Sequence, residues 1–118
     1  MTEKVIGRAI EVHRVLGPGL LESAYEECLA FELKLAGFKV ARQVQLPIRY
    51  KELDLDCGYR IDLLINESLI VELKTVENLL PIHEAQLLTY LRLGGITTGL
   101  LINFNVPVLK NGLRRMKL

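Results

Sequence analysis

Three charged residues stand inside two otherwise aliphatic runs near the middle of the chain. Asp62 lies in the run 59–65, and Glu72 and Lys74 lie in the run 69–74. Buried strands rarely carry charge without a partner or a metal, because removing a lone carboxylate from water is costly. An aspartate on one strand and Glu-x-Lys on the next form a minimal set of groups for metal-assisted phosphodiester hydrolysis.

The spacing between the two runs predicts how these groups meet. If residues 66–68 form a three-residue loop, Ile65 faces Leu69 and the antiparallel register places Asp62 opposite Glu72. Directly opposed residues have Cβ atoms roughly 4.5–5.5 Å apart, so both carboxylates can hold one cation. Without a cation, one carboxylate must keep its proton. An all-oxygen site suits Mg²⁺ or Mn²⁺, whereas zinc favours His or Cys.

The composition provides ample apolar material for a core and little net charge. The chain has 118 residues, of which 50% are hydrophobic, and a formal net charge of +1. We expect a single domain over residues 1–118. Without a long apolar run or a signal-peptide pattern, we expect no membrane partner and a cytoplasmic location. Because the net charge is small, any nucleic-acid contact must come from a local basic patch, a metal or a partner.

Hydrophobic periodicity and turn residues predict the order α-α-β-β-β-α-β-β, an α/β fold with a central mixed sheet flanked by helices. The predicted elements are helices at about 3–15 and 20–36, a strand at 38–50, a hairpin at 55–74, a helix from Pro81 to Gly94-Gly95, a strand at 98–104, and a last strand after an Asn111-Gly112 hairpin signal. Cys28 and Cys57 have no metal-ligand spacing and are expected in or near the core.

Further polar residues extend the pattern. Glu22 lies on the second predicted helix, and Gln86 and Tyr90 are four residues apart on a later helix, hence on one face. The order Glu…Asp…Glu-x-Lys…Gln-x-x-x-Tyr resembles the PD-(D/E)xK nuclease superfamily, which has the restriction-endonuclease-like fold. The Gln-x-x-x-Tyr element resembles its RecB-type subgroup. The proline before the first catalytic aspartate of that superfamily is absent, since Ile61 precedes Asp62.

A narrower resemblance comes from three segments. Residues 19–25 read Gly-Leu-Leu-Glu-Ser-Ala-Tyr and are similar to the signature of the bacterial GxxExxY proteins. Residues 81–91 and 101–105 also look like that family, and the resemblance covers about residues 6–118.

The resemblance implies a metal site and a set of catalytic residues. Asp62 and Glu72 would ligate the metal, the backbone carbonyl of Leu73 would complete the coordination, and Glu22 would ligate it directly or through water. The implied catalytic residues are Glu22, Asp62, Glu72, Lys74 and Gln86. Lys74 would orient or activate the attacking water and offset charge on the phosphorane. Gln86 would position water or a phosphate oxygen, and Tyr90 would contact the substrate backbone.

The implied function is Mg²⁺- or Mn²⁺-dependent hydrolysis of DNA or RNA. The alternative is a non-catalytic module on the same fold that binds nucleic acid or protein; the short chain favours it, and a homodimer would reconcile the two by enlarging the groove. Simpler roles also exist for single residues. The three hairpin charges could form a solvated salt-bridge cluster, Tyr90 could pack in the core, and His83, Tyr25 and Glu26 are expected to be mainly structural.

Overall fold

A five-stranded mixed sheet organises the chain. In the computed structural model, which describes residues 1–118, the strand order is β1-β4-β5-β6-β7. All neighbours are antiparallel except β5 and β6, which are parallel. The strands are β1 Val40–Gln45, β4 Arg60–Ile65, β5 Leu69–Lys74, β6 Thr98–Asn103 and β7 Leu113–Lys117. The predicted α/β class, with helices flanking a central mixed sheet, is confirmed.

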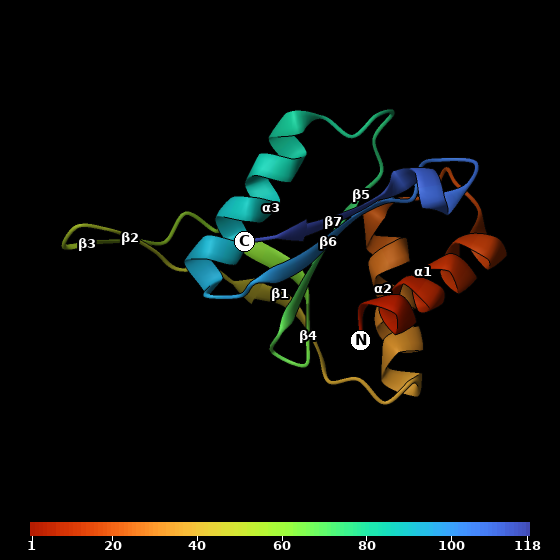
Figure 1. The fold of residues 1–118 in the computed structure, drawn as a ribbon, viewed down its shortest axis with the longest axis horizontal. Helices are drawn as coiled ribbons and strands as arrows, with labels where there is room; N and C mark the ends of the chain where they lie inside the picture. The colour runs from red at the N-terminus through yellow and green to blue at the C-terminus, as the bar shows by residue number, and fades with distance from the viewer.

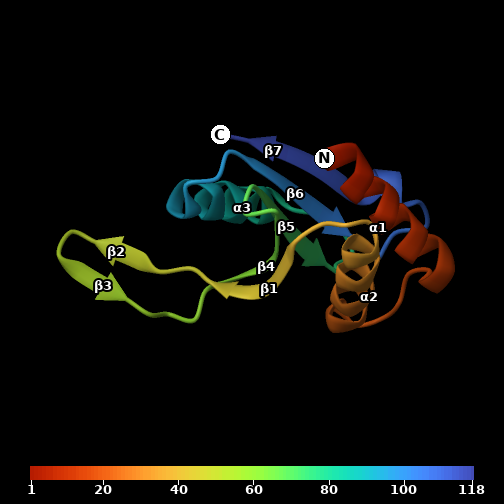
Figure 2. The ribbon, with the colours of Figure 1, turned by 90° about the horizontal axis from the view of Figure 1, so that it is seen from below.

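Helices cover both faces of this sheet. Helices α1 (Thr2–Leu16) and α2 (Glu22–Leu35) lie on one face, and α3 (Pro81–Gly94), which joins β5 to β6, lies on the other (Figures 1 and 2). Each face has its own apolar cluster, and alternate residues of β5 enter different ones: Val71 joins the α1–α2 cluster and Ile70 joins the α3 cluster. The two central parallel strands are apolar on both sides for this reason. None of the three helices combines the length and apolarity needed to cross a membrane.

Tyr25 fixes the approach to α2. Its side chain is fully buried, and its ring stacks on Phe104 with the centroids 4.5 Å apart. Its hydroxyl donates to the Gly17 carbonyl oxygen (2.6 Å) and accepts from the Leu20 N–H (3.2 Å). The tyrosine of the Gly19–Tyr25 motif therefore holds the glycine-containing loop from which α2 begins.

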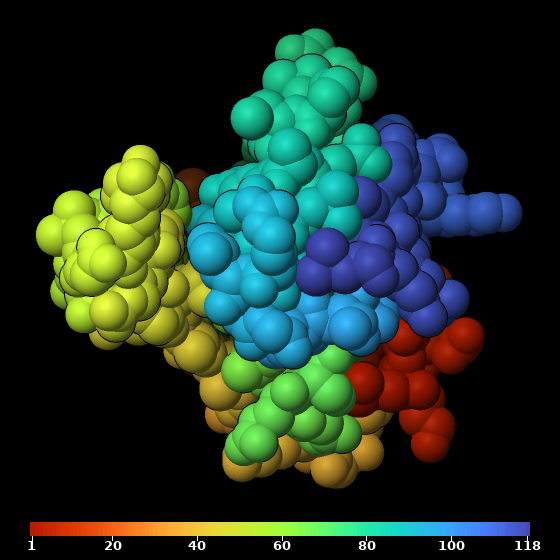
Figure 3. All heavy atoms as spheres, turned by 60° about the vertical axis from the view of Figure 1, so that its left-hand side comes forward, coloured from red at the N-terminus to blue at the C-terminus, as the bar shows by residue number.

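A protruding arm replaces part of the predicted strand at 38–50. That strand ends at Gln45, and the chain then forms a separate two-stranded sheet from β2 (Ile48–Tyr50) and β3 (Leu53–Leu55). Pro47 lies between β1 and β2, where its missing N–H and fixed φ interrupt strand pairing. The arm extends well away from the sheet and forms a distinct lobe beside α3 (Figures 1–3).

The tail also differs from its prediction. Asn111 and Gly112 end a short 3-10 helix, Leu109–Gly112, and do not form a hairpin turn. Gly112 packs so close to the end of β6 that a Cβ built on it would lie 2.2 Å from the Asn103 carbonyl oxygen. Glycine is therefore required at position 112 because the backbone of Asn103 leaves no room for a Cβ, and not because of a hairpin turn. Cys57, expected near the core, is exposed.

Replacing Gly112 by Ala should lower the free energy of unfolding by about 2–3 kcal/mol, because the clashing atom belongs to backbone and cannot move aside cheaply. Gly7→Ala is the matched control. Gly7 lies inside α1 with open space where a Cβ would go, so alanine there should stabilise by about 0.5–1 kcal/mol. Urea unfolding of both variants measures the difference, and equal midpoints would contradict it.

Candidate functional site

The β4–β5 hairpin has the predicted register. Ile65 pairs with Leu69, so residues 66–68 form the predicted three-residue loop. The ladder runs as far as Leu63 paired with Val71. Beyond it, Asp62 interacts with the Glu72 side chain and accepts a hydrogen bond from the Leu73 N–H.

The loop is held in this form by the start of β1. Asn66 and Glu67 both adopt left-handed backbone, with φ of 50° and 55°. Asn66 exchanges two hydrogen bonds with the Lys39 backbone: its N–H donates to the carbonyl oxygen and its Oδ1 accepts from the N–H, each at 2.8 Å. Asparagine tolerates this conformation better than most residues. The register of the hairpin is therefore fixed at both its loop and its core.

The two carboxylates occupy different environments. Asp62 is half-buried, and its Oδ2 accepts from the Leu73 N–H at 2.9 Å. Glu72 is buried, with 6% of its surface exposed, and its Oε1 has no hydrogen-bond partner. Burial, then a hydrogen bond with Asp62 and the charge of Asp62, raise the pKa of Glu72 to about 10. At neutral pH Glu72 is thus neutral unless a cation offsets its charge.

The donor set of this pair fits a hard divalent cation. Glu72 presents an unpartnered buried oxygen, and Asp62 presents a second carboxylate next to it. Mg²⁺ is commonly held by one or two carboxylates and several waters, so two carboxylates suffice. No three His, Cys, Asp or Glu side chains gather closely enough to hold an ion by themselves, which leaves Glu22 outside the pair.

Glu22 nevertheless lies close enough to Asp62 and Lys74 for their charges to act on it. It is the first residue of α2, and its side chain reaches the surface. Partial burial and then the negative charge of Asp62 raise the pKa of Glu22, while the positive charge of Lys74 opposes the shift. The N-terminus of α2 therefore brings a third carboxyl group to the edge of the pair.

Lys74 connects the sheet to α3. It is the last residue of β5, and its Nζ donates to the Gln86 Oε1 at 3.5 Å. Gln86 Nε2 in turn donates to the Tyr90 hydroxyl at 3.0 Å. Tyr90 is buried, and its burial raises the pKa of its hydroxyl, so the phenol keeps its proton. The structure thus brings five of the predicted site residues together: Asp62, Glu72, Lys74, Gln86 and Tyr90.

Three residues beside the site were not identified as part of it from sequence. Glu26, expected to be mainly structural, is buried and contacts β1. Its Oε2 accepts from the Arg42 Nε (3.1 Å) and Nη2 (3.0 Å), and its Oε1 accepts from the Gln43 Nε2 at 2.5 Å. The same Gln43 nitrogen lies 3.2 Å from the Asp62 Oδ1. The available signal was the spacing of Glu26, one helical turn after Glu22.

Two other polar residues have structural roles. Asn103 is buried and bonds both backbone groups of Val76, accepting from the N–H (3.1 Å) and donating to the carbonyl oxygen (2.9 Å). It thereby holds the segment that leaves Lys74. His83 accepts from the Leu80 N–H through Nδ1 at 3.0 Å and caps the start of α3.

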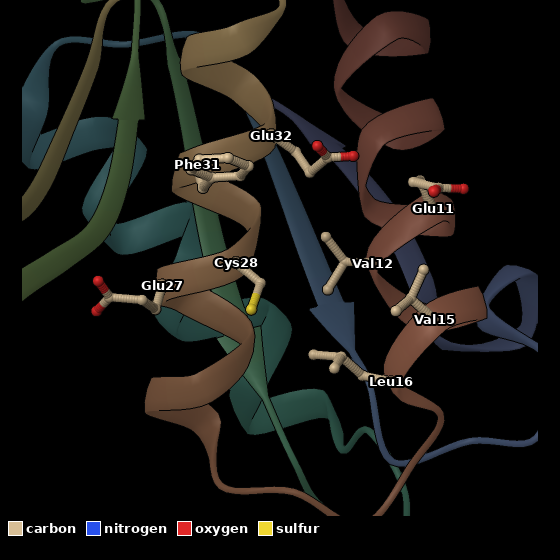
Figure 4. Close-up of a pocket in the computed structure, with 8 residues that line it drawn as sticks. All are labelled: Glu11, Val12, Val15, Leu16, Glu27, Cys28, Phe31 and Glu32. Atoms are coloured by element: carbon tan, nitrogen blue, oxygen red, sulfur yellow. The ribbon is translucent and has the colours of Figure 1, made fainter.

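Two grooves differ in their relation to the site. One, of about 410 Å³, lies between α1 and α2 among apolar side chains such as Val15, Cys28 and Phe31, and no site residue lines it (Figure 4). The other, of about 260 Å³, lies between the base of the arm and α3. Its walls include Gln86, Tyr90 and Tyr59, so it opens directly beside the site.

Replacing Glu72 by Gln should raise the free energy of unfolding at pH 7, without divalent ions, by about 2–3 kcal/mol. The folded protein keeps the Glu72 proton above the ordinary pKa of 4.5, whereas the unfolded chain loses it, so wild-type stability declines as pH rises from there toward 10. The gain from Gln should therefore be absent at pH 4 and grow with pH.

Denaturant unfolding at pH 4, 6 and 8 measures this gain. The control is Glu67→Gln in the hairpin loop, where an ion pair with Lys39 lowers the pKa of the carboxyl. That substitution should give no gain at any pH. An equal pH-independent change in both variants would contradict the assignment of a protonated Glu72.

Comparison with known families adds one finding. The family model described as the PD-(D/E)XK nuclease superfamily matches residues 1–116. No curated protein and no solved structure matches the chain significantly.

Proposed function

The chain belongs to the PD-(D/E)XK nuclease superfamily, and we propose that it is a Mg²⁺- or Mn²⁺-dependent nuclease that hydrolyses DNA or RNA phosphodiester bonds. The observation that carries this proposal is the Asp62–Glu72 pair, with its unpartnered buried oxygen and with Lys74 two residues further along β5. The Gly19–Tyr25 motif supports a narrower place among the GxxExxY proteins.

In this proposal Asp62 and Glu72 hold the ion, with the Leu73 carbonyl as a further oxygen donor and Glu22 acting through water. When bound, a divalent ion polarises a phosphoryl oxygen and lowers the pKa of a water molecule. Asp62 is already oriented for this role, because the Leu73 N–H fixes one of its oxygens. Glu72 would hold the ion as a carboxylate, since a nearby positive charge favours its ionised form.

Lys74 and α3 would then act on the substrate. The ammonium group of Lys74 orients the attacking water and stabilises negative charge that develops on the phosphoryl group. Its hydrogen bond to Gln86 directs the ammonium toward the site. Gln86 can also donate to water or to a phosphate oxygen, while Tyr90 contacts the nucleic acid beside it.

The groove beneath the arm gives the neighbouring nucleotide a place to lie. Tyr59 and Tyr90 meet edge to face there, with centroids 6.4 Å apart, and Tyr59 is 44% exposed. Exposed aromatic rings stack on unpaired bases with little dependence on sequence. A strand whose phosphate reaches Lys74 would therefore have an aromatic wall next to it.

Lys74→Ala should lower the cleavage rate at least about 100-fold while the affinity for Mn²⁺ and the melting temperature stay near wild type, because Lys74 acts on water and phosphate and does not bind the ion. Asp62→Ala should instead weaken Mn²⁺ binding itself. Cleavage of single- and double-stranded DNA and RNA with Mn²⁺, and calorimetric titration of the ion, measure the two effects.

Lys34→Ala, an exposed lysine at the far end of α2, is purified in parallel as the control. Equal cutting by Lys74→Ala and Lys34→Ala would identify a contaminating nuclease. If no substrate is cut and no divalent ion binds, the protein is a non-catalytic module on this fold.

Tyr59→Ala should weaken binding of a single-stranded oligonucleotide by about tenfold, since one base stacked on an aromatic ring contributes about 1–3 kcal/mol. The control is Tyr50→Ala, which removes an exposed tyrosine from the arm at a place outside the groove. Fluorescence anisotropy with Ca²⁺ in place of Mg²⁺ measures the affinity without turnover. Equal losses in both variants would rule out a specific role for the groove.

A further inference from the structure

Gln43 has an unusual backbone for its position. Four residues other than glycine have positive φ: Lys51, Asn66 and Glu67 lie in turns, but Gln43, with φ of 51°, lies inside β1. The left-handed conformation is unfavourable for a residue with a Cβ, and regular strand pairing does not require it. The pairing of β1 with β4 accordingly passes from Arg42 to Val44 without a partner for Gln43.

The left-handed residue changes which face the following side chains occupy. Residues two apart on a regular strand share a face. In β1, Val40 packs against the α1–α2 cluster, but Val44 packs against the α3 cluster. The switch between them allows two consecutive side chains, Arg42 and Gln43, both to reach Glu26 on α2.

The Gln43 amide joins two carboxylates at this point. Its Nε2 donates to the Glu26 Oε1 (2.5 Å) and to the Asp62 Oδ1 (3.2 Å). An amide NH₂ donates and a carboxylate oxygen accepts, so the nitrogen end of the Gln43 amide faces both partners. Glu26 is itself anchored by Arg42. A continuous series of hydrogen bonds therefore runs from Arg42 through Glu26 and Gln43 to Asp62.

Together with the Leu73 N–H, Gln43 leaves Asp62 little rotational freedom. One contact holds Oδ2 at 2.9 Å and the other holds Oδ1 at 3.2 Å. Outer contacts of this kind orient ligating carboxylates, and their loss typically reduces metal affinity 10–100-fold. Strained backbone often occurs at functional sites, and here the strained residue is the one whose amide contacts Asp62.

We propose that Gln43 is a positioning residue that orients Asp62 for the divalent cation and links it, through Glu26, to the helix that carries Glu22. This inference rests on the proposed metal-dependent function. It assigns a purpose to the left-handed backbone in β1. Gln43 stands between Arg42 and Val44, whose partners Leu63 and Ile61 flank Asp62, and its amide reaches both Asp62 and Glu26.

Two substitutions separate this role from a structural one. Gln43→Gly removes the amide and suits positive φ, and Gln43→Asn tolerates positive φ but has an amide one methylene too short to span both carboxylates. Both variants should bind Mn²⁺ at least tenfold more weakly than wild type by calorimetric titration. Without metal, Gln43→Gly should melt at or above the wild-type temperature. Gln43→Asn should melt near the wild-type temperature.

Lys51 provides the matched control, because it has φ of 54° in the exposed turn of the arm, away from the carboxylates. Lys51→Gly and Lys51→Asn should leave Mn²⁺ affinity unchanged. Wild-type Mn²⁺ affinity in both Gln43 variants, or a lowered melting temperature with unchanged affinity, would overturn the proposal and leave the metal site itself standing. Wild-type protein that binds no divalent ion would overturn both this proposal and the proposed function.

Discussion

The opposition of Asp62 and Glu72 on neighbouring strands is the interaction on which the surrounding structure depends. Two ionised carboxylates in a buried site repel strongly, and neither can be fully hydrated there. Burial of Glu72, followed by its hydrogen bond with Asp62 and the charge of Asp62, raises the pKa of Glu72 to about 10, so without a cation the side chain keeps its proton. The proton neutralises the charge of Glu72, as a bound divalent ion would.

The position of this pair follows from the packing of the core. Val71 and Leu73 are buried against α1 and α2, and Ile70 is buried against α3. A register slip by one residue would move each of these side chains to the wrong face, so burial of the apolar residues also fixes where the carboxylates stand. The loop at 66–68 and its two hydrogen bonds to Lys39 specify the same register locally.

The sequence was most informative where periodicity or counting determines geometry. The fold class and the three long helices follow from apolar spacing. The odd loop between β4 and β5 was inferred from the requirement that Asp62 and Glu72 share a face, and strand parity then gave the register. The arm and the structure of the Asn111-Gly112 segment could not be predicted from the sequence, because local turn signals do not show which distant backbone a segment will contact. Gln43 was also unpredictable: glutamine has no preference for left-handed backbone, and its conformation depends on contacts with Glu26 and Asp62 that come from other elements.

The charges around the site suggest an order of events. Glu26 is neutralised by Arg42, which lets α2 lie against β1. Glu22, four residues earlier on the same helix, has no ion pair and faces the field of Asp62. Glu22, Asp62 and Glu72 thus gather around a single cationic side chain, the ammonium group of Lys74. In the proposed function, a divalent ion would supply the positive charge that these carboxyl groups lack. The ion would then bind before the anionic phosphate, because the carboxyl groups alone would repel the phosphate.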